Sequence, residues 1–193
     1  MGVVMKNVIE SYNETLASLP RIRKEKGGGK SRGASGKLYE DLIKGICDVN
    51  NIVAKSNDMI ISEEIDGLIR KNLQVDKHLY YNGVLKKMVE SKGYLDLCYY
   101  IRALFNFVEM EKSPHTPNDL EYAIFAGQHT VNEDNMKYYK AWFKRETGKE
   151  VKFFTVCQQK QRSATKAVYM EKYADDFKLD MKEVNEFVEW LVK

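Results

Sequence analysis

Apolar residues that recur every three or four positions predict a series of amphipathic helices along this chain. The spacing predicts helices over residues 7–19, 35–55, 94–108 and 132–146, followed by a C-terminal helix that contains Val184, Phe187 and Leu191. Pro20 ends the first of these helices, and Gly148 ends the fourth. Residues 94–108 are apolar on most sides, so we expect that helix to be buried on more than one face.

Short apolar runs between the predicted helices indicate β-strands. We expect strands at residues 59–61, 122–125 and 151–156, and a hairpin over residues 74–92, where Asn82-Gly83 favours a tight turn. Residues 65–70 fit a helical turn as well as a strand. The alternation of strands and helices predicts an α/β fold, with a central mixed β-sheet flanked by helices, in a single domain over residues 1–193.

The hairpin carries the candidate chemistry. Asp76 lies on its first arm, Glu90 on its second arm, and Lys92 two residues beyond Glu90. Because successive side chains of a strand point to opposite faces, Glu90 and Lys92 share a face. Two carboxylates on neighbouring strands can hold Mg²⁺, and an ammonium group beside them can orient or help to deprotonate an attacking water. This set of groups suits the hydrolysis of a phosphodiester.

The geometry of the hairpin sets a condition on this site. A regular hairpin with a two-residue turn at Asn82-Gly83 would place Asp76 on the opposite face from Glu90. A three-residue loop, or a β-bulge in either arm, would bring Asp76 onto the face of Glu90. We therefore predict an irregularity in this hairpin.

Positive charge is concentrated in one segment of the chain. The formal net charge is only +3, but residues 21–37 hold seven Lys and Arg residues and one Glu. This segment is rich in Gly and Ser, so we expect a flexible basic arm over residues 21–36. The arm can contact DNA phosphates, with Lys30, Arg32 and Lys37 as the candidates, or remain a solvated loop. It lacks the spacing of a P-loop and follows no strand, so we expect no nucleotide cofactor.

A second candidate contact with DNA follows the predicted strand at residues 151–156. This polar run contains Gln158, Gln159, Lys160 and Arg162. Gln pairs with adenine and Arg with guanine when they reach base edges in the major groove. A solvated polar loop is the alternative.

Several classes of protein are not indicated. The three cysteines lie far apart and form no CxxC pair, and the three histidines share no metal-ligand spacing. No apolar run approaches the roughly 20 residues that span a bilayer. We expect a soluble, cytoplasmic protein with no membrane partner.

The residues of the hairpin resemble a known motif. Asp76, thirteen intervening residues and then Glu90-Ser91-Lys92 resemble the motif of the PD-(D/E)XK nuclease superfamily, with Val75 in place of the motif's proline. The predicted elements of residues 37–157 also resemble the αβββαβ core of restriction endonucleases. Residues 1–36 then form a helical and basic arm before this catalytic core, and residues 158–193 form a loop and helices after it.

Within this superfamily the chain looks most like a type II restriction endonuclease. The resemblance implies a homodimer that cuts double-stranded DNA at a short specific sequence and requires Mg²⁺. It implies that Asp76 and Glu90 are metal ligands and that Lys92 is the catalytic lysine. It also implies a glutamate on the first core helix, for which Glu40 is the candidate and Asp41 the rival. A structure-specific repair or junction-resolving nuclease is one alternative, and a catalytically silent nucleic-acid-binding module is another.

Overall fold

The computed structural model describes residues 5–12, 14, 28–56, 64–65, 68–69, 75–156 and 179–193. Residues 5–12 are helical, in agreement with the first part of the helix predicted over residues 7–19, whereas its predicted end at Pro20 lies outside the described residues. The helices that follow are α2 (Gly28–Val49), α3 (Leu97–Glu111), α4 (Glu133–Thr147) and α6 (Met181–Val192). The strands are β1 (Val53–Lys55), β2 (Glu64–Ile65), β3 (Leu68–Ile69), β4 (Lys77–Tyr81), β5 (Val84–Leu95), β6 (Glu121–His129) and β7 (Val151–Thr155).

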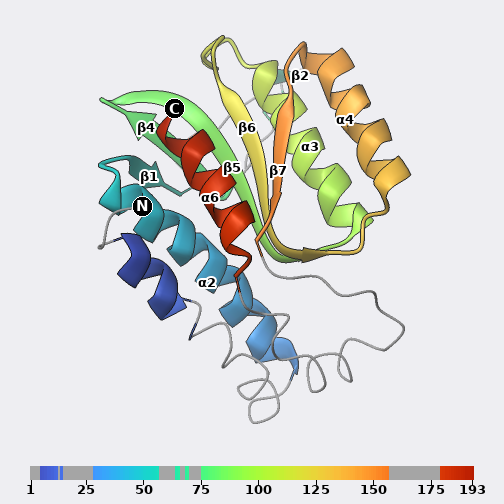
Figure 1. The fold of residues 1–193 in the computed structure, drawn as a ribbon. Helices are drawn as coiled ribbons and strands as arrows, with labels where there is room; N and C mark the ends of the chain where they lie inside the picture. The colour runs from blue at the N-terminus through green and yellow to red at the C-terminus, as the bar shows by residue number, and fades with distance from the viewer. Residues whose placement is uncertain are drawn as a thin grey trace.

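Five of the strands form a mixed sheet in the order β1-β4-β5-β6-β7. The pairs β1–β4 and β4–β5 are antiparallel, whereas β5–β6 and β6–β7 are parallel. The two parallel pairs are joined by crossovers that contain α3 and α4, as parallel pairing requires. The predicted α/β fold with a central mixed sheet is confirmed (Figure 1).

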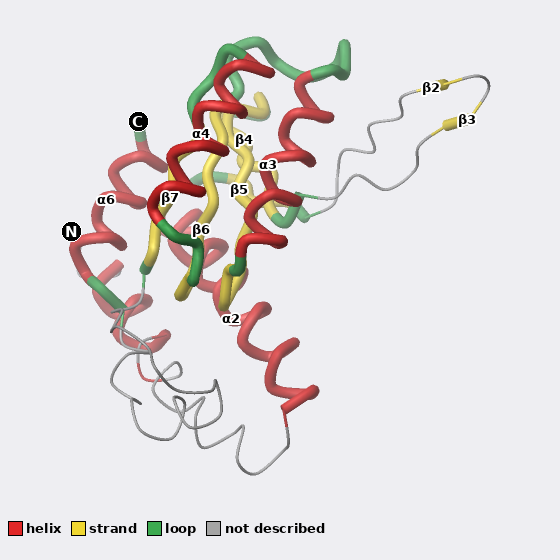
Figure 2. Tube along the Cα trace, turned by 90° about the vertical axis from the view of Figure 1, so that its right-hand side faces the viewer, coloured by secondary structure: helices red, strands yellow, loops and turns green. Residues whose placement is uncertain are grey.

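Each face of the sheet is covered by its own pair of helices (Figures 1 and 2). One core cluster joins α2 and α6 to the sheet through residues such as Leu42, Val89 and Phe187. The other joins α3 and α4 to the opposite face through residues such as Met88 and Phe107. The aromatic-rich helix α3 is buried against the sheet and α4, which fits its apolar sequence.

The short strands β2 and β3 pair with each other and form a separate two-stranded ribbon (Figure 2). Apart from Glu64, they lie in the segment 65–70, for which the sequence pattern fitted a helical turn as well as a strand. The structure therefore favours the strand. The predicted strand at residues 59–61 lies outside the described residues.

Two expectations about the second helix were wrong. The helix ends at Val49 instead of near residue 55, because Asn51 adopts a left-handed φ of 58° and the chain turns into β1. It begins at Gly28, so the expected flexible arm is helical from that residue onward. The buried face from Tyr39 to Cys47 packs against the core and stabilises the helix. Each residue that extends the helix toward its N-terminus then adds one backbone hydrogen bond, and this gain outweighs the low helix propensity of the glycines.

The other helices differ from their predicted bounds by a few residues. Helix α3 begins at Leu97, later than expected, because Tyr94 and Leu95 still pair with β6 and the Asp96 side chain caps the helix. Helix α4 matches its prediction closely, since Asn132 caps its start and Gly148 ends it with a left-handed φ of 72°. No helix in the described part of the chain is long and apolar enough to cross a membrane.

Candidate active site

A β-bulge in the β4–β5 hairpin brings the candidate carboxylates together. The turn is a tight two-residue turn, with φ values of 50° at Asn82 and 82° at Gly83. The pairing then shifts: Tyr80 lies opposite Leu85, but Leu79 lies opposite Lys87. One extra residue therefore sits in β5, and the irregularity predicted from the sequence is confirmed.

Beyond the bulge, Lys77 lies opposite Val89, so Asp76 comes alongside Glu90. The backbone N–H of Asp76 donates to Glu90 Oε2 over 3.3 Å. The backbone N–H of Ser91 donates to Asp76 Oδ2 over 2.8 Å. Each carboxylate is thus oriented by the backbone of the other strand, which holds both side chains on one face of the sheet.

The ammonium of Lys92 lies where three oxygen atoms converge. Its Nζ is 2.7 Å from Glu90 Oε1, 3.0 Å from Asp76 Oδ2 and 3.0 Å from the Ser91 carbonyl oxygen. The side chains of Lys92 and Asp76 are about a quarter exposed, at 26% and 24%, whereas that of Glu90 is only 8% exposed. Solvent and a substrate can therefore reach Lys92 and Asp76 more easily than Glu90.

Burial and neighbouring charge shift the acidity of this cluster. Burial raises the pKa of Glu90, and the charge of Asp76 raises it further, while Lys92 only partly offsets both effects. Burial alone would lower the pKa of Lys92, but the carboxylates of Glu90 and Asp76 outweigh it and raise that pKa. The cluster therefore favours the charged form of Lys92, and it makes Glu90 a weaker acid than an ordinary glutamate.

The donor set fits a hard divalent cation. Oxygen atoms of Asp76, Glu90 and the Ser91 carbonyl already surround the Lys92 ammonium. Mg²⁺ is commonly held by one or two carboxylates, with water and phosphate oxygens as its other ligands. Among the described residues, no group of three or more His, Cys, Asp and Glu side chains is arranged to hold a metal ion. Any metal here would thus depend on Asp76, Glu90, a peptide carbonyl and ligands from outside the chain.

Glu40 does not join this cluster through any direct contact that the structure records. Its Oε2 is 3.3 Å from Nζ of Lys77, which also donates to Ser56 Oγ over 2.6 Å. Lys77 is buried and follows Asp76, so the two side chains project to opposite faces of the sheet. Glu40 and Lys77 therefore tie α2 to the strand that carries Asp76. Its rival Asp41 lies near Tyr12, whose pKa is raised by burial and then by Asp41.

Sequence reasoning missed the role of Lys77. A lysine within a strand, one residue from a candidate ligand and with the opposite orientation, was the available signal. Because charged side chains are rarely buried unless paired, a lysine on the inward face of this strand is expected to have an acidic partner.

The predicted DNA-contacting residues fall partly outside the described residues. Lys37 is exposed on α2, and the backbones of Lys30 and Arg32 lie in the first turns of that helix. The polar run with Gln158, Gln159, Lys160 and Arg162 is not among the described residues.

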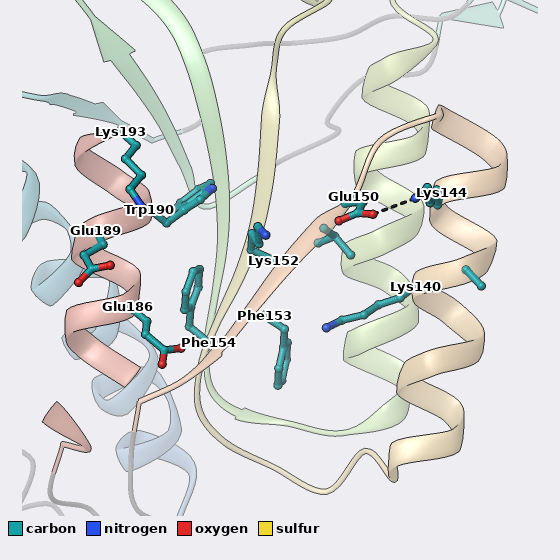
Figure 3. Close-up of a pocket in the computed structure, with 12 residues that line it drawn as sticks. Lys140, Lys144, Glu150, Lys152, Phe153, Phe154, Glu186, Glu189, Trp190 and Lys193 are labelled. Atoms are coloured by element: carbon teal, nitrogen blue, oxygen red, sulfur yellow. Dashed lines mark hydrogen bonds and ion pairs between the residues drawn. The ribbon is translucent and has the colours of Figure 1, made fainter. Parts of the chain in front are cut away.

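A groove separate from the carboxylate cluster lies at the β7 edge of the sheet. It has a volume of about 650 Å³ and is lined by α4, β7 and α6 (Figure 3). Lys140 and Lys144 line the α4 side, and Glu186 and Glu189 line the α6 side. Neither Asp76, Glu90 nor Lys92 lines it. No feature of the sequence pattern indicated this groove, because it is assembled from three segments.

No protein-family model and no curated protein matches this sequence. Among solved structures, the chain is similar to NucC of P. aeruginosa ATCC27853 in its cAAA-bound form, with a TM-score of 0.50, 10% sequence identity and coverage of 100% of both chains. At this identity the likeness concerns the fold. The five-stranded mixed sheet flanked by helices is consistent with the predicted restriction-endonuclease-like core.

Proposed function

We propose that this protein is a Mg²⁺-dependent endonuclease that hydrolyses phosphodiester bonds of double-stranded DNA. The observation that carries the proposal is the bulge that brings Asp76, Glu90 and Lys92 onto one face of the β4–β5 hairpin. A solvated face of a hairpin has no need to place a largely buried carboxylate beside a second carboxylate and an ammonium group. The nuclease-like fold supports the same proposal.

Asp76 and Glu90 would hold the metal, with the Ser91 carbonyl as a further oxygen ligand. When bound, such an ion stabilises negative charge on a phosphoryl oxygen and lowers the pKa of a coordinated water. Lys92 has three N–H donors, so it can keep a hydrogen bond to one carboxylate while it donates another to the phosphate or orients the attacking water. The water oxygen would form a bond to phosphorus and lose a proton to solvent, the bond to one ester oxygen would break, and a proton from solvent would complete the hydroxyl group of the leaving strand.

Glu40 and Lys77 would support this site from the other face of the sheet. The partly buried ion pair would hold the start of β4 against α2 and so help to fix the backbone N–H and the side chain of Asp76. Glu40 thus acts on Asp76 through Lys77, in contrast to the direct catalytic role that the family resemblance implies.

The more specific form of the proposal is a type II restriction enzyme. Such an enzyme cuts both strands of a short symmetric sequence, and a homodimer supplies two sites related by the same symmetry. A structure-specific repair or junction-resolving nuclease uses the same chemistry on branched DNA. A nucleic-acid-binding module would keep the fold without cleavage.

One assay separates these functions. The protein is incubated with plasmid, genomic and four-way-branched DNA, in Mg²⁺ and in EDTA. Discrete Mg²⁺-dependent fragments of genomic DNA would support the restriction enzyme, and cleavage confined to branched DNA would support the structure-specific nuclease. Because the NucC structure is bound to cAAA, each reaction is also run with cAAA. If no DNA is cut under any condition, the proposed nuclease function is wrong.

The raised pKa of Glu90 predicts how cleavage depends on pH. Metal binding requires the deprotonated carboxylate, so metal affinity should fall as the pH drops through this pKa, which lies above the ordinary value of 4.5. At subsaturating Mg²⁺ the cleavage rate should decline on the acid side, and saturating Mg²⁺ should move that decline to lower pH because the metal competes with the proton. Single-turnover rates from about pH 5 to pH 8 at two Mg²⁺ concentrations measure this. Identical profiles at both concentrations would contradict a role for Glu90 as a ligand.

A further inference from the structure

The N-terminal half of α2 projects beyond the sheet, and its charged residues are all basic. We propose that this half, residues 28–37, binds duplex DNA by lying in the major groove. The choice of DNA as the partner rests on the proposed nuclease function, whereas the projecting basic helix is a property of the fold.

Helix α2 changes character along its length. From Leu38 onward it packs on the sheet through an apolar face that includes Tyr39, Leu42 and Ile46. Residues 28–37 contain no apolar residue larger than alanine, so they have little to contribute to a core. In Figure 2 this half of the helix continues past the end of the strands. The core therefore holds one half of α2 and leaves the other half projecting.

The projecting half begins close to the candidate active site. Glu40 pairs with Lys77 at 3.3 Å, and Lys77 directly follows Asp76. Gly28, the first residue of α2, lies roughly 18 Å from Glu40 along the helix, which rises about 1.5 Å per residue. This distance corresponds to roughly five base pairs of duplex DNA. The helix can thus contact DNA within half a turn of the bond that the carboxylates would act on.

The charge of the projecting half is unbalanced. Residues 28–37 hold three basic residues and no Asp or Glu, so their formal charge of +3 equals that of the whole chain. The basic residues are Lys30, Arg32 and Lys37. In the packed half, by contrast, the exposed Lys44 is paired with Asp48 at 2.6 Å. A helix with unbalanced positive charge is complementary to the phosphates of DNA.

The helical conformation determines how this segment can meet DNA. An α-helix with its side chains is about 10–12 Å across, which matches the major groove, about 12 Å wide, but not the minor groove, about 6 Å wide. Successive residues are about 100° apart around a helix, so positions 30 and 32 lie on opposite sides of it. A helix in the major groove has a phosphate backbone on each side. The two positions can therefore face one backbone each.

A flexible basic arm is the alternative, because it would bring the same charge to DNA without a fixed geometry. Four of the ten residues from 28 to 37 are glycine, which disfavours a helix relative to alanine. The two modes of binding differ in their response to a helix-breaking residue. An arm that binds through charge alone tolerates a proline, whereas a helix in a groove does not.

Binding is measured by fluorescence anisotropy with a fluorescent DNA duplex in EDTA, so that no DNA is cut. The double variant K30Q/R32Q should bind about tenfold more weakly, and its salt dependence should be shallower by about two phosphate contacts. Ala34→Pro should also bind at least about tenfold more weakly, although no charge changes, because proline inside a helix breaks it. K44Q is the control in the packed half, and its affinity should equal that of the wild type.

Methylation of guanine N7 reports the groove directly, because N7 lies in the major groove. The wild type should protect guanines of the bound duplex from methylation. Ala34→Pro, at a concentration that saturates the duplex, should leave them unprotected.

Equal affinity of the wild type and Ala34→Pro would show a flexible arm and overturn the groove-binding helix. Equal affinity for the duplex and for a single strand of the same length would overturn it too. Thermal unfolding of each variant checks that the packed half keeps its fold. Cleavage in Mg²⁺ is scored separately: binding without cleavage would refute the nuclease function alone, and cleavage with equal binding by all variants would refute the groove-binding helix alone.

Discussion

Asp76→Asn should reduce Mg²⁺-dependent DNA cleavage by roughly 10³-fold or more, while the protein stays folded. The carboxylate of Asp76 is one of two that can hold the metal, and a neutral amide is a much weaker ligand. The amide oxygen can still accept the hydrogen bond from the Ser91 N–H, so the register of the hairpin should persist. Plasmid cleavage, with thermal unfolding as the check on folding, measures both effects.

Asp119→Asn is the control for this substitution. Asp119 also forms an ion pair with a lysine, Lys86, but it is exposed and lies outside the cluster. Loss of such a surface pair costs little stability, so cleavage should remain close to that of the wild type. Full activity of Asp76→Asn would show that Asp76 is not a metal ligand.

Lys92→Met should separate metal binding from cleavage. In the wild type the Lys92 ammonium contacts both carboxylates, and a metal ion must compete with it for their oxygens. Methionine keeps the length of the side chain but removes the charge. Metal affinity at alkaline pH should therefore be equal to or higher than that of the wild type, whereas cleavage should fall by about 10²- to 10⁴-fold because the N–H donor is lost.

The pH dependence of this variant gives a second signature. Lys92 lowers the pKa of Glu90, so its removal should raise that pKa further. Metal affinity should then be lost at a higher pH than in the wild type. Calorimetric titration with Mn²⁺ at two pH values, alongside cleavage assays, tests this, with Lys86→Met as the control. A parallel loss of metal binding and cleavage at alkaline pH would mean that Lys92 serves the structure of the site and not the reaction.

Local features of the chain were sufficient to predict most elements of the fold. The N-cap Asn132 and the C-terminal Gly148 mark helix α4 in the sequence because caps involve only the backbone of the adjacent turn. Asn82-Gly83 predicts the hairpin turn because both residues tolerate positive φ. The pairing of Glu90 with Lys92 follows from the two-residue repeat of a strand.

The position of the bulge was decided only by the tertiary structure. Leu85 and Val89 are both apolar and four residues apart, so a regular strand would bury them on the same face. In the structure Leu85 packs in the core with α3 and α4, whereas Val89 packs in the core with α2 and α6. An extra residue must therefore lie between them, but the apolar pattern does not state which face each residue occupies.

By itself, then, the sequence determined the helices, the hairpin turn and the residue types of the candidate site, because these depend on neighbouring residues. The tertiary structure decided that Asp76 meets Glu90, that Glu40 meets Lys77 and that three segments line a groove beside β7. Each of these contacts joins segments whose relative positions are set by packing on the two faces of the sheet. The physical reason is that burial is shared across the whole core, whereas propensity and spacing act over only a few residues.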